Sequence, residues 1–479
     1  MTKTIIGEPA TGAAPRNVIG IAGLGGAIAI MAIVLLLPTP EGMSPDAQRM
    51  AAIFAATLVL WSTEAMPIAV TGLLAVILQP IFRINPLGPA VANFISPPFM
   101  FVVVMFVIAY AWVKTGLARR FALWMISKAG TDAKRVISVF VIGTGIISMF
   151  ISDVPCAAIF MAIAFGMFQK LGLKPLQSQF GKAVMLGIPI GSLIGGVGTP
   201  AGSSVNLLGL TIMEQNGVAR IPFLHWMAIG VPMVIILLPV ACLVLIWYYP
   251  PEIKTIGAIS EIQQERRDLG PMSINEKKVL VIMGVMMTLW ILGTWYPAIF
   301  DTFIVGIAGA IVMFLPGINL FTWKEVQDST GWDTLMMIGG VTTLGAASTK
   351  TGLAKWIVDS TMGGLQDMSM VMVLLIICAF TVVIHLILPV NPAIVAAIIP
   401  PLVLLGKATG VNPAIYALPV AFTASCAFLL PLDAVPLITY SKGYYRILDM
   451  FIPGAIISVV WVIVMTALLM LVGPMIGIL

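Results

Sequence analysis

Apolar runs of about 18 or more residues recur along the whole chain, and this length matches the hydrocarbon core of a lipid bilayer. The first run, Val18 to Leu37, is too long for a secretory signal and has no small-residue cleavage site before Pro38. We therefore interpret it as the first of many spans. The pattern predicts an all-helical integral membrane protein.

The composition agrees with lipid as the solvent. Of the 479 residues, 60% are hydrophobic and 9% are charged, whereas a soluble globular protein has about 25% charged residues. The net charge of +5 comes from basic residues in short loops beside the spans, so we expect no nucleic-acid partner. The four cysteines lie far apart in apolar segments without metal-ligand spacing, and we expect no cofactor apart from a coupling ion.

Hydropathy divides the chain into a series of expected spans. They are residues 18–37, 51–66, 68–82, 99–113, 136–150, 183–210, 226–249, 279–297, 303–316, 334–348, 371–388, 414–430 and 453–476. Two further apolar stretches each follow a span with almost no loop and begin with polar residues or proline. We expect these stretches to be re-entrant segments that form helical hairpins near residues 151–168 and 390–405.

Charge in the loops predicts orientation. Residues 114–135 contain six Lys or Arg and residues 250–278 contain five, so both loops are expected on the cytoplasmic side. Residues 1–17 then form a cytoplasmic N-terminal tail. The second loop also contains five acidic residues, which is typical of a solvated helical linker rather than a regulatory site.

The chain contains an internal duplication. The sequence Lys-Thr-Gly-Leu-Ala-Arg at 114–119 returns as Lys-Thr-Gly-Leu-Ala-Lys at 350–355, and a polar interruption followed by alanines occurs at both 152–158 and 390–397. These pairs are 236 and 238 residues apart, so coincidence is a poor explanation. We expect a first transmembrane repeat over residues 18–249, a cytoplasmic linker over 250–278, and a second repeat over 279–479. Duplicated halves with interrupted helices predict inverted repeats around a site near the bilayer midplane.

The interrupted helices have the chemistry to bind ions. A helix broken inside the membrane exposes N–H groups, which favour a carboxylate, and carbonyls, which with hydroxyls suit sodium. The run at 195–204 combines four glycines with Thr199, Pro200, Ser203 and Ser204, and Pro200 prevents a continuous helix. A glycine-rich packing face with an incidental kink is the structural alternative.

The segment Trp-Ser-Thr-Glu-Ala-Met-Pro at 61–67 resembles the Trp-x-Thr-Glu-Ala-x-Pro segment of the divalent anion:sodium symporter family, which carries di- and tricarboxylates or sulfate. The glycine-rich run from Gly195 and the run Ser-Cys-Ala-Phe-Leu-Leu-Pro at 425–431 extend the resemblance, which covers the chain after residue 18. It implies a homodimer. Each protomer would have a scaffold domain and a transport domain that slides as an elevator, with two hairpin tips meeting at the substrate.

The resemblance places the site at the hairpin tips, where the family has a Ser-Asn-Thr triplet in each half. This chain has Ser-Asp-Val at 152–154 and Val-Asn-Pro at 390–392, so each tip keeps one residue of the triplet. The expected substrate-binding residues are Ser152, Asp153, Val154, Thr199, Pro200, Ser203, Asn391, Pro392 and Ala434.

Sodium is the coupling ion that the resemblance implies. Candidate ligands of a first sodium site are Ser148, Ser152 and Gly198, whereas Leu386 occupies the position that matches Ser148 in the second half. This loss of side-chain oxygens from the second site favours weakened or absent sodium dependence, and a second site retained on backbone carbonyls is the alternative. The residues expected to couple transport to a cation or a proton are Ser148, Ser152, Asp153, Gly198, Asn391 and Asp433.

Two carboxyl groups, Asp153 and Asp433, have no counterpart in the family pattern. A carboxyl group near the membrane interior is a functional candidate, because it could bind a proton or hold sodium. Capping of a helix N-terminus is the structural alternative for each.

The sequence predicts a secondary transporter of small anions, foremost di- or tricarboxylates, acting by symport or exchange in a bacterial inner membrane. An alternative is transport of sulfate or a sulfonate with proton coupling. A membrane enzyme is the rival from another class, but two distant histidines and the absence of an HExxH or Ser/His/Asp pattern provide little for catalysis. A channel is disfavoured because no repeated selectivity filter is present.

Overall fold

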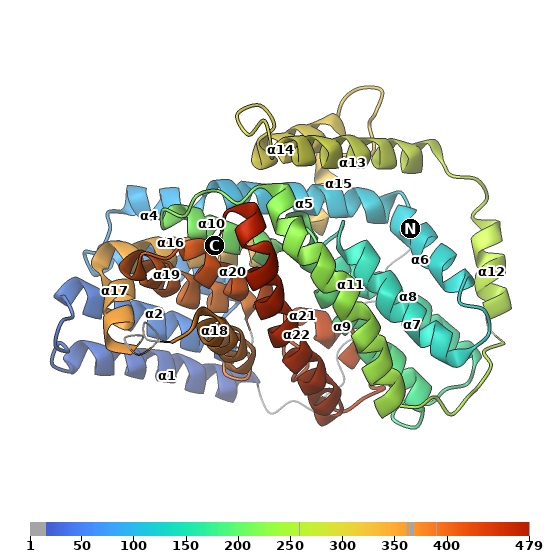
Figure 1. The fold of residues 1–479 in the computed structure, drawn as a ribbon, viewed down its shortest axis with the longest axis horizontal. Coiled ribbons are helices and arrows are strands. Elements are labelled where there is room, and N and C mark those ends of the chain that lie inside the picture. The colour runs from blue at the N-terminus through green and yellow to red at the C-terminus, as the bar shows by residue number, and fades with distance from the viewer. Residues whose placement is uncertain (1–15, 258, 362–363, 365–367, 389, 479) are drawn as a thin grey trace.

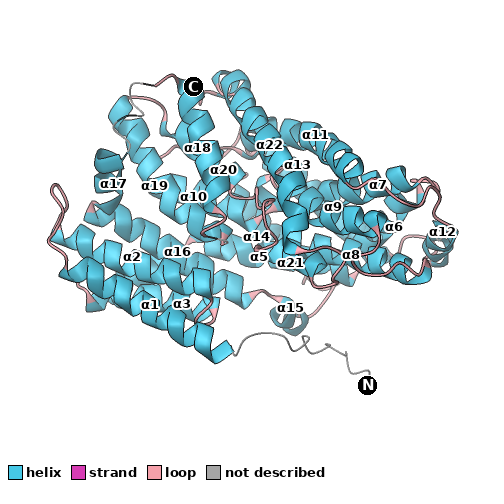
Figure 2. Ribbon diagram, turned by 90° about the horizontal axis from the view of Figure 1, so that it is seen from below, coloured by secondary structure: helices cyan, strands magenta, loops and turns pink. Residues whose placement is uncertain are grey.

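The computed structural model describes residues 16–257, 259–361, 364, 368–388 and 390–478. Within these residues every regular element is a helix, apart from an isolated bridge between Asp132 and Thr255 (Figures 1 and 2). Most of the expected N-terminal tail, residues 1–15, lies outside the described residues.

The first half contains twelve α- and 3₁₀-helices among its described residues. They are α1 (Arg16–Leu36), α2 (Pro45–Thr63), α3 (Ile68–Ile81), α4 (Leu87–Phe94), α5 (Pro97–Lys114), α6 (Leu117–Ser127), α7 (Ala133–Ser148), α8 (Asp153–Lys170), α9 (Gln179–Gly196), η1 (Pro200–Gly202), α10 (Ser204–Gln215) and α11 (Phe223–Tyr248). The linker contains α12 (Ile259–Asp268).

The second half repeats this plan. Its helices are α13 (Ile274–Leu292), α14 (Thr302–Val312), α15 (Trp323–Ser329), α16 (Trp332–Thr351), α17 (Leu353–Thr361), α18 (Met370–Ile384), α19 (Asn391–Thr409), α20 (Pro413–Thr423), α21 (Ala434–Tyr440), η3 (Ile447–Met450), α22 (Phe451–Val472) and η4 (Pro474–Ile476). Each expected span overlaps a helix, and 183–210 is broken into α9, η1 and α10. The short helices α4, α6, α12, α15, α17 and α21 were not among the expected spans.

The duplicated Lys-Thr-Gly-Leu-Ala segment forms the same turn twice. Gly116 joins α5 to α6 with φ 81°, and Gly352 joins α16 to α17 with φ 82°. This left-handed conformation favours glycine because it has no Cβ. The same backbone at both positions, followed in each half by a helical hairpin and a broken helix, supports the duplication inferred from sequence.

The two halves exchange the outer parts of their broken helices. Helix α10 of the first half packs against α19 and α20 of the second, while α21 of the second half packs against α8 and α9 of the first. Helices α11 and α22 lie against each other between these two groups (Figure 1). Each hairpin is thus packed against the end of a helix from the other half.

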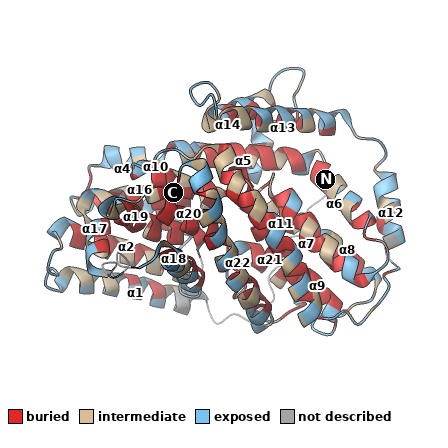
Figure 3. Ribbon diagram, in the orientation of Figure 1, coloured by how far each residue is buried: buried red, intermediate tan, exposed pale blue. Residues whose placement is uncertain are grey.

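The outward surface is apolar where lipid would lie. On α11, Leu243 and Trp247 are about 70% exposed, at 69% and 73%, and α22 exposes Val459 and Ile463. Buried residues are concentrated on the inner faces, whereas α12 is largely exposed (Figure 3). Among the described residues, five segments are long and apolar enough to cross a membrane: 87–114, Asp153–Lys170, Phe223–Tyr248, Asn391–Thr409 and Ile447–Val472.

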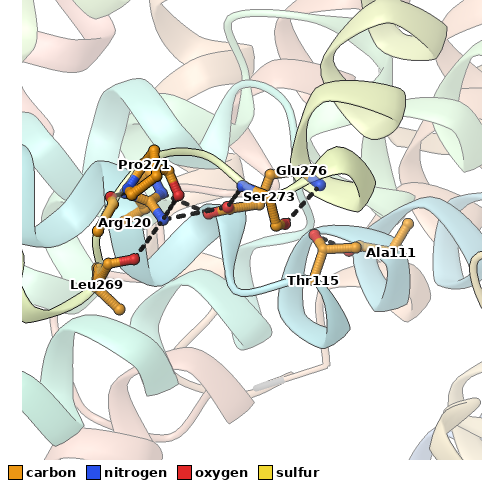
Figure 4. Close-up of polar contacts among 8 residues, drawn as sticks. Ala111, Thr115, Arg120, Leu269, Pro271, Ser273 and Glu276 are labelled. Atoms are coloured by element: carbon orange, nitrogen blue, oxygen red, sulfur yellow. Dashed lines mark hydrogen bonds and ion pairs between the residues drawn. The ribbon is translucent and has the colours of Figure 1, made fainter.

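Arg120 of α6 makes several hydrogen bonds to the linker between the halves. Arg120 donates to Glu276 Oε1 at 2.5 Å and to the Gly270 carbonyl at 2.8 Å, with longer bonds to the carbonyls of Leu269 and Pro271 (Figure 4). Glu276 also forms a capping box with Ser273 at the start of α13. Burial favours the neutral form of Glu276, but hydrogen bonds from Arg120 and Ser273 outweigh it and lower the pKa of this carboxyl.

Candidate functional site

The first hairpin turns within four residues. Helix α7 ends at Ser148 and α8 begins at Asp153, with Ser152 as the N-cap of α8 at φ −53° and ψ 146°. The Ser152 hydroxyl makes no capping hydrogen bond, so it is free to face outward. Asp153 does not cap α8; its side chain turns inward instead.

Hydroxyl groups surround the Asp153 carboxylate. Ser148 Oγ donates to Asp153 Oδ1 at 2.7 Å, and Ser203 interacts with the same carboxylate. Ser192 Oγ donates to the Asp153 carbonyl at 2.9 Å and lies 3.2 Å from Ser148 Oγ. Asp153 is 6% exposed, and no Lys or Arg pairs with it within the described part of the chain. A buried carboxyl group with hydroxyl neighbours of this kind is suited to hold a hard cation or a proton.

Two glycines in the broken helix, which runs from α9 through η1 to α10, allow the first hairpin to pack closely against it. A Cβ on Gly196 would lie 2.1 Å from Asp153 Oδ1, and one on Gly202 would lie 2.9 Å from the Ser148 carbonyl oxygen. By contrast, a Cβ on Gly195 would meet the backbone of Gly145 in α7. The glycine-rich run is therefore both a helix-packing face and the wall of the Asp153 cluster.

Backbone carbonyls at the break between α9 and α10 accept hydrogen bonds from side chains. Asn206 Nδ2 donates to the carbonyls of Gly196 at 2.8 Å and Thr199 at 3.0 Å. Thr199 Oγ1 donates to the Met149 carbonyl at 2.7 Å and so ties the break to the hairpin tip. Pro200 begins the buried η1 turn, and Gly198 packs against Met149. These contacts fix the tip and the break as one unit.

A cavity of about 430 Å³ adjoins this unit. One wall comes from the hairpin and the restarted helix, with Ser152, Val154 and Ser204, and the other from α5 and the α15–α16 junction, including Tyr110 and Thr334. Among the described residues, the lining includes no Lys, Arg, Asp or Glu. Its full set is Val102, Met105, Phe106, Ala109, Tyr110, Val113, Ser152, Val154, Pro155, Ala201, Ser204, Ser329, Gly331 and Thr334.

The second tip differs. Asn391 begins α19 and is buried, yet its Oδ1 atom has no hydrogen-bond partner among the described residues. Pro392 follows at the second position of α19 and is also buried. A buried amide oxygen without a partner is uncommon in folded proteins, and it marks a position that a ligand or an ion could satisfy.

Asp433 lies between the two tips. Its Oδ1 accepts from the Val435 N–H at 3.0 Å and caps α21, as the structural alternative predicted. Its charge also reaches Asp153 at the first tip and His385 at the second. Ala434, the first residue of α21, is exposed beside it.

The predicted residues thus separate into three places. Ser148, Asp153, Thr199, Ser203 and the glycines form the inward cluster; Ser152 and Val154 face the cavity; Asn391, Pro392, Asp433 and Ala434 belong to the second half. The sequence interpretation did not include Ser192. It also did not predict that Asn206 hydrogen-bonds the carbonyls of the broken helix. The signal for Ser192 was its hydroxyl within an otherwise apolar helix, one turn before Gly196.

An all-helical membrane protein with duplicated halves, paired hairpins and broken helices beside a cavity is a membrane transporter by architecture. Residues 21–479 match the family model described as "Sodium:sulfate symporter transmembrane region". The chain belongs to this family.

Curated relatives cover most of the chain. A protein named "Membrane protein" from Cupriavidus necator is 30% identical over 437 residues, which cover 86% of this chain and 84% of the relative. The sodium-dependent dicarboxylate transporter SdcS of Staphylococcus saprophyticus is 28% identical over 478 residues, covering 94% and 91%. The protein of the same name from Staphylococcus aureus strain USA300 is 28% identical over 443 residues, covering 87% and 84%.

Solved structures support the fold at low sequence identity. The Neisseria gonorrhoeae MtrF structure, whose title describes a class of antimetabolite efflux pumps, aligns with TM-score 0.51 and 12% identity over 96% of this chain and 95% of its own. The Alcanivorax borkumensis YdaH transporter aligns with TM-score 0.54 and 12% identity, covering 95% and 98%.

Proposed function

We propose that this protein is a secondary active transporter that moves small carboxylate anions, foremost di- or tricarboxylates, together with sodium. The observation that carries the proposal is the Asp153 cluster, where a buried carboxyl group has hydroxyl partners and, in the described part of the chain, no positive side chain in an ion pair with it. A cation that travels with the substrate would neutralise it. The SdcS relatives, named as sodium-dependent dicarboxylate transporters, favour sodium as that cation.

The sodium ligands would come from the inward cluster. Ser148 and Asp153 supply side-chain oxygens, and Ser192 lies within the same hydrogen-bonded group. Of the candidates from sequence, Ser148 fits this role, whereas Ser152 faces the cavity and Gly198 packs on Met149. Oxygen ligands of this kind suit a hard cation.

The anion would bind where the first tip faces the cavity. The Ser152 and Ser204 hydroxyls line the cavity near the start of α8, where helix N–H groups favour negative charge. Asn391 would contribute its amide, whose oxygen lacks a partner in the described structure. Because the cavity wall has no charged side chain, helix dipoles and hydrogen bonds would supply the recognition.

Movement would follow the packing of the helices. Helices α7–α11 and α18–α22 interlock through the exchanged ends α10 and α21 and would move as one transport domain. Helices α1–α5 and α13–α16 would form the scaffold, and a homodimer would join two scaffolds. The linker at 250–278 and the N-terminal tail would face the cytoplasm of a bacterial inner membrane.

Reconstitution of the purified protein tests this proposal. Vesicles loaded without sodium should accumulate labelled succinate or citrate when sodium is added outside, and sodium should fail to drive uptake in empty vesicles. Proton coupling is the second candidate, because a buried carboxyl without a cationic partner could also carry a proton. Accumulation driven by a pH gradient without sodium would support that candidate, and uptake of sulfate or a sulfonate but no carboxylate would overturn the proposed substrate class.

A further inference from the structure

His385 lies buried at the second hairpin tip, just after α18. Its Nδ1 is 2.6 Å from the Thr381 carbonyl oxygen, and its Nε2 is 3.0 Å from the Ala424 carbonyl oxygen. A carbonyl oxygen only accepts hydrogen bonds, and a neutral imidazole has only one N–H to donate. Both contacts can be hydrogen bonds only when the ring carries two protons.

The two carbonyls belong to helix ends where positive charge is favoured. Thr381 lies in the last turn of α18, and Ala424 is the C-cap of α20. Carbonyls at a helix C-terminus carry the negative end of the helix dipole. The break after α20 therefore presents a negative surface that an imidazolium, rather than a neutral ring, would satisfy.

Asp433 provides the matching negative charge. It lines, together with His385, a space of only about 10 Å³. Burial of the ring disfavours its charged form, and the hydrogen bonds to the carbonyls of Ala424 and Thr381 and the charge of Asp433 oppose that cost. Helix α18 packs against α20 and α22, and in the described residues no other charged side chain interacts with His385. The other titratable groups nearby, the thiols of Cys378 and Cys426, are neutral core residues.

This second-half space offers a sodium ion few side-chain oxygen ligands. A volume of about 10 Å³ is at the limit for a single water molecule. Apart from Asp433, its walls are aliphatic side chains that offer no oxygen: Leu386, Ala427, Leu429, Leu430 and Leu432. In the first half, by contrast, the Asp153 carboxylate has hydroxyl neighbours and no positive side chain.

We propose that His385 is held as an imidazolium and supplies the positive charge of the second half, so that the transporter takes its external cation at the first half alone. The transport consequence rests on the proposed function, whereas the protonation state of His385 does not. His385 acts on coupling as a positioning residue: it supports the second tip through backbone carbonyls and offsets Asp433.

The chain has only two histidines, which makes a direct test practical. Full-length protein with ¹⁵N-labelled histidine rings and the substitution His225→Gln contains His385 as its one labelled ring. At neutral pH its nitrogen spectrum should show two protonated ring nitrogens. Asp433→Asn keeps a side chain that can cap α21 but removes the charge, and it should populate the neutral ring under the same conditions. One protonated and one unprotonated nitrogen in the protein that retains Asp433 would overturn the proposal.

Transport provides a second readout. The initial rate of carboxylate uptake should rise with sodium with a Hill slope of about one, since a single external ion acts. A slope well above one, with more than one sodium moved per substrate, would overturn the single-site conclusion. Absence of carboxylate transport in the wild-type protein would contradict the proposed function but leave the histidine spectrum to decide the state of His385.

Discussion

Gly196 lies so close to Asp153 that a Cβ on the glycine would be 2.1 Å from the carboxylate oxygen Oδ1. Both groups are buried, and the oxygen is already bonded to Ser148. The broken helix therefore bounds the carboxylate as closely as its hydroxyl partners do. Any side chain at residue 196 must displace Asp153.

We expect Gly196→Ala to reduce sodium-driven uptake by about tenfold or more, because a displaced carboxylate changes its free energy of ion binding by at least about 1.4 kcal/mol. The measurement is the initial uptake rate in vesicles at matched protein content. Gly166→Ala is the control, because a Cβ at that position of α8 meets nothing within 4 Å. Equal rates for the two variants would show that the Gly196 contact is unimportant for transport.

Asn391→Ala should weaken substrate affinity without destabilising the protein. The Asn391 Oδ1 atom has no partner to lose, so the unfolding temperature without substrate should stay the same or rise. Hydrogen bonds to a charged group contribute about 1.5–3 kcal/mol, so the KM for the anion should rise about tenfold or more. Asn93→Ala, at a partly exposed position of α4, serves as the control. Unchanged kinetics in Asn391→Ala would place this residue outside the binding site.

Arg120→Ala should destabilise the protein markedly more than Arg119→Ala. Arg120 pairs with the nearly buried Glu276 and also holds the linker carbonyls, whereas Arg119 pairs with Glu265 at an exposed position. Removing one partner from a buried pair costs about 3 kcal/mol, and an exposed pair contributes at most about 1 kcal/mol. Thermal unfolding in detergent measures both. Similar melting temperatures for the two variants would contradict the proposed difference.

The same ion pair should make stability depend on pH. The pKa of Glu276 is lowered in the folded protein, so its contribution is fully present above the unfolded value of about 4.3. The contribution is lost as the pH falls from there through the lower folded pKa. Glu276→Gln should therefore narrow the difference in melting temperature between pH 6 and pH 3. If Glu276→Gln changes its melting temperature with pH as much as the wild type does, Glu276 is not the source of the pH dependence.

Much of this fold could be predicted from the sequence because the bilayer restricts the options. Apolar length located the spans, and the interruptions at 152 and 391 located the starts of α8 and α19 within one residue. Short helices such as α6 and α17 were not predicted, because they are too short and too polar to resemble spans. Helix length and hydropathy carry no signal for them.

The candidate site could be predicted only in part. Hydroxyls and glycines around residue 200 indicated an ion-binding break, and the structure brings them to Asp153. Whether a given side chain faces the cavity or the interior depends on the rotation of each helix start. Ser152 and Asp153 are adjacent in sequence yet face opposite ways. The exchange of α10 and α21 between halves is likewise a tertiary feature, which composition and spacing do not encode.

Asp153→Asn tests how transport is coupled. The amide keeps the shape and an oxygen that can accept from Ser148 Oγ, so the fold and some substrate exchange should survive. It removes the negative charge, however, and unit charges 4 Å apart interact by about 4 kcal/mol at an effective dielectric constant of 20. Even if the amide oxygen recovers much of this energy, the sodium concentration for half-maximal uptake should rise about tenfold or more.

The alternative for Asp153 gives a different result. If Asp153 carries a proton, the amide imitates the protonated acid, so Asp153→Asn should abolish accumulation driven by a pH gradient while exchange between equal solutions continues. Sodium titrations in that variant would then match the wild type. Uptake into vesicles with a sodium gradient alone, a pH gradient alone, or neither distinguishes these cases. An unchanged response to both gradients would show that the buried carboxylate of α8 has no part in coupling, even though it has no positive partner.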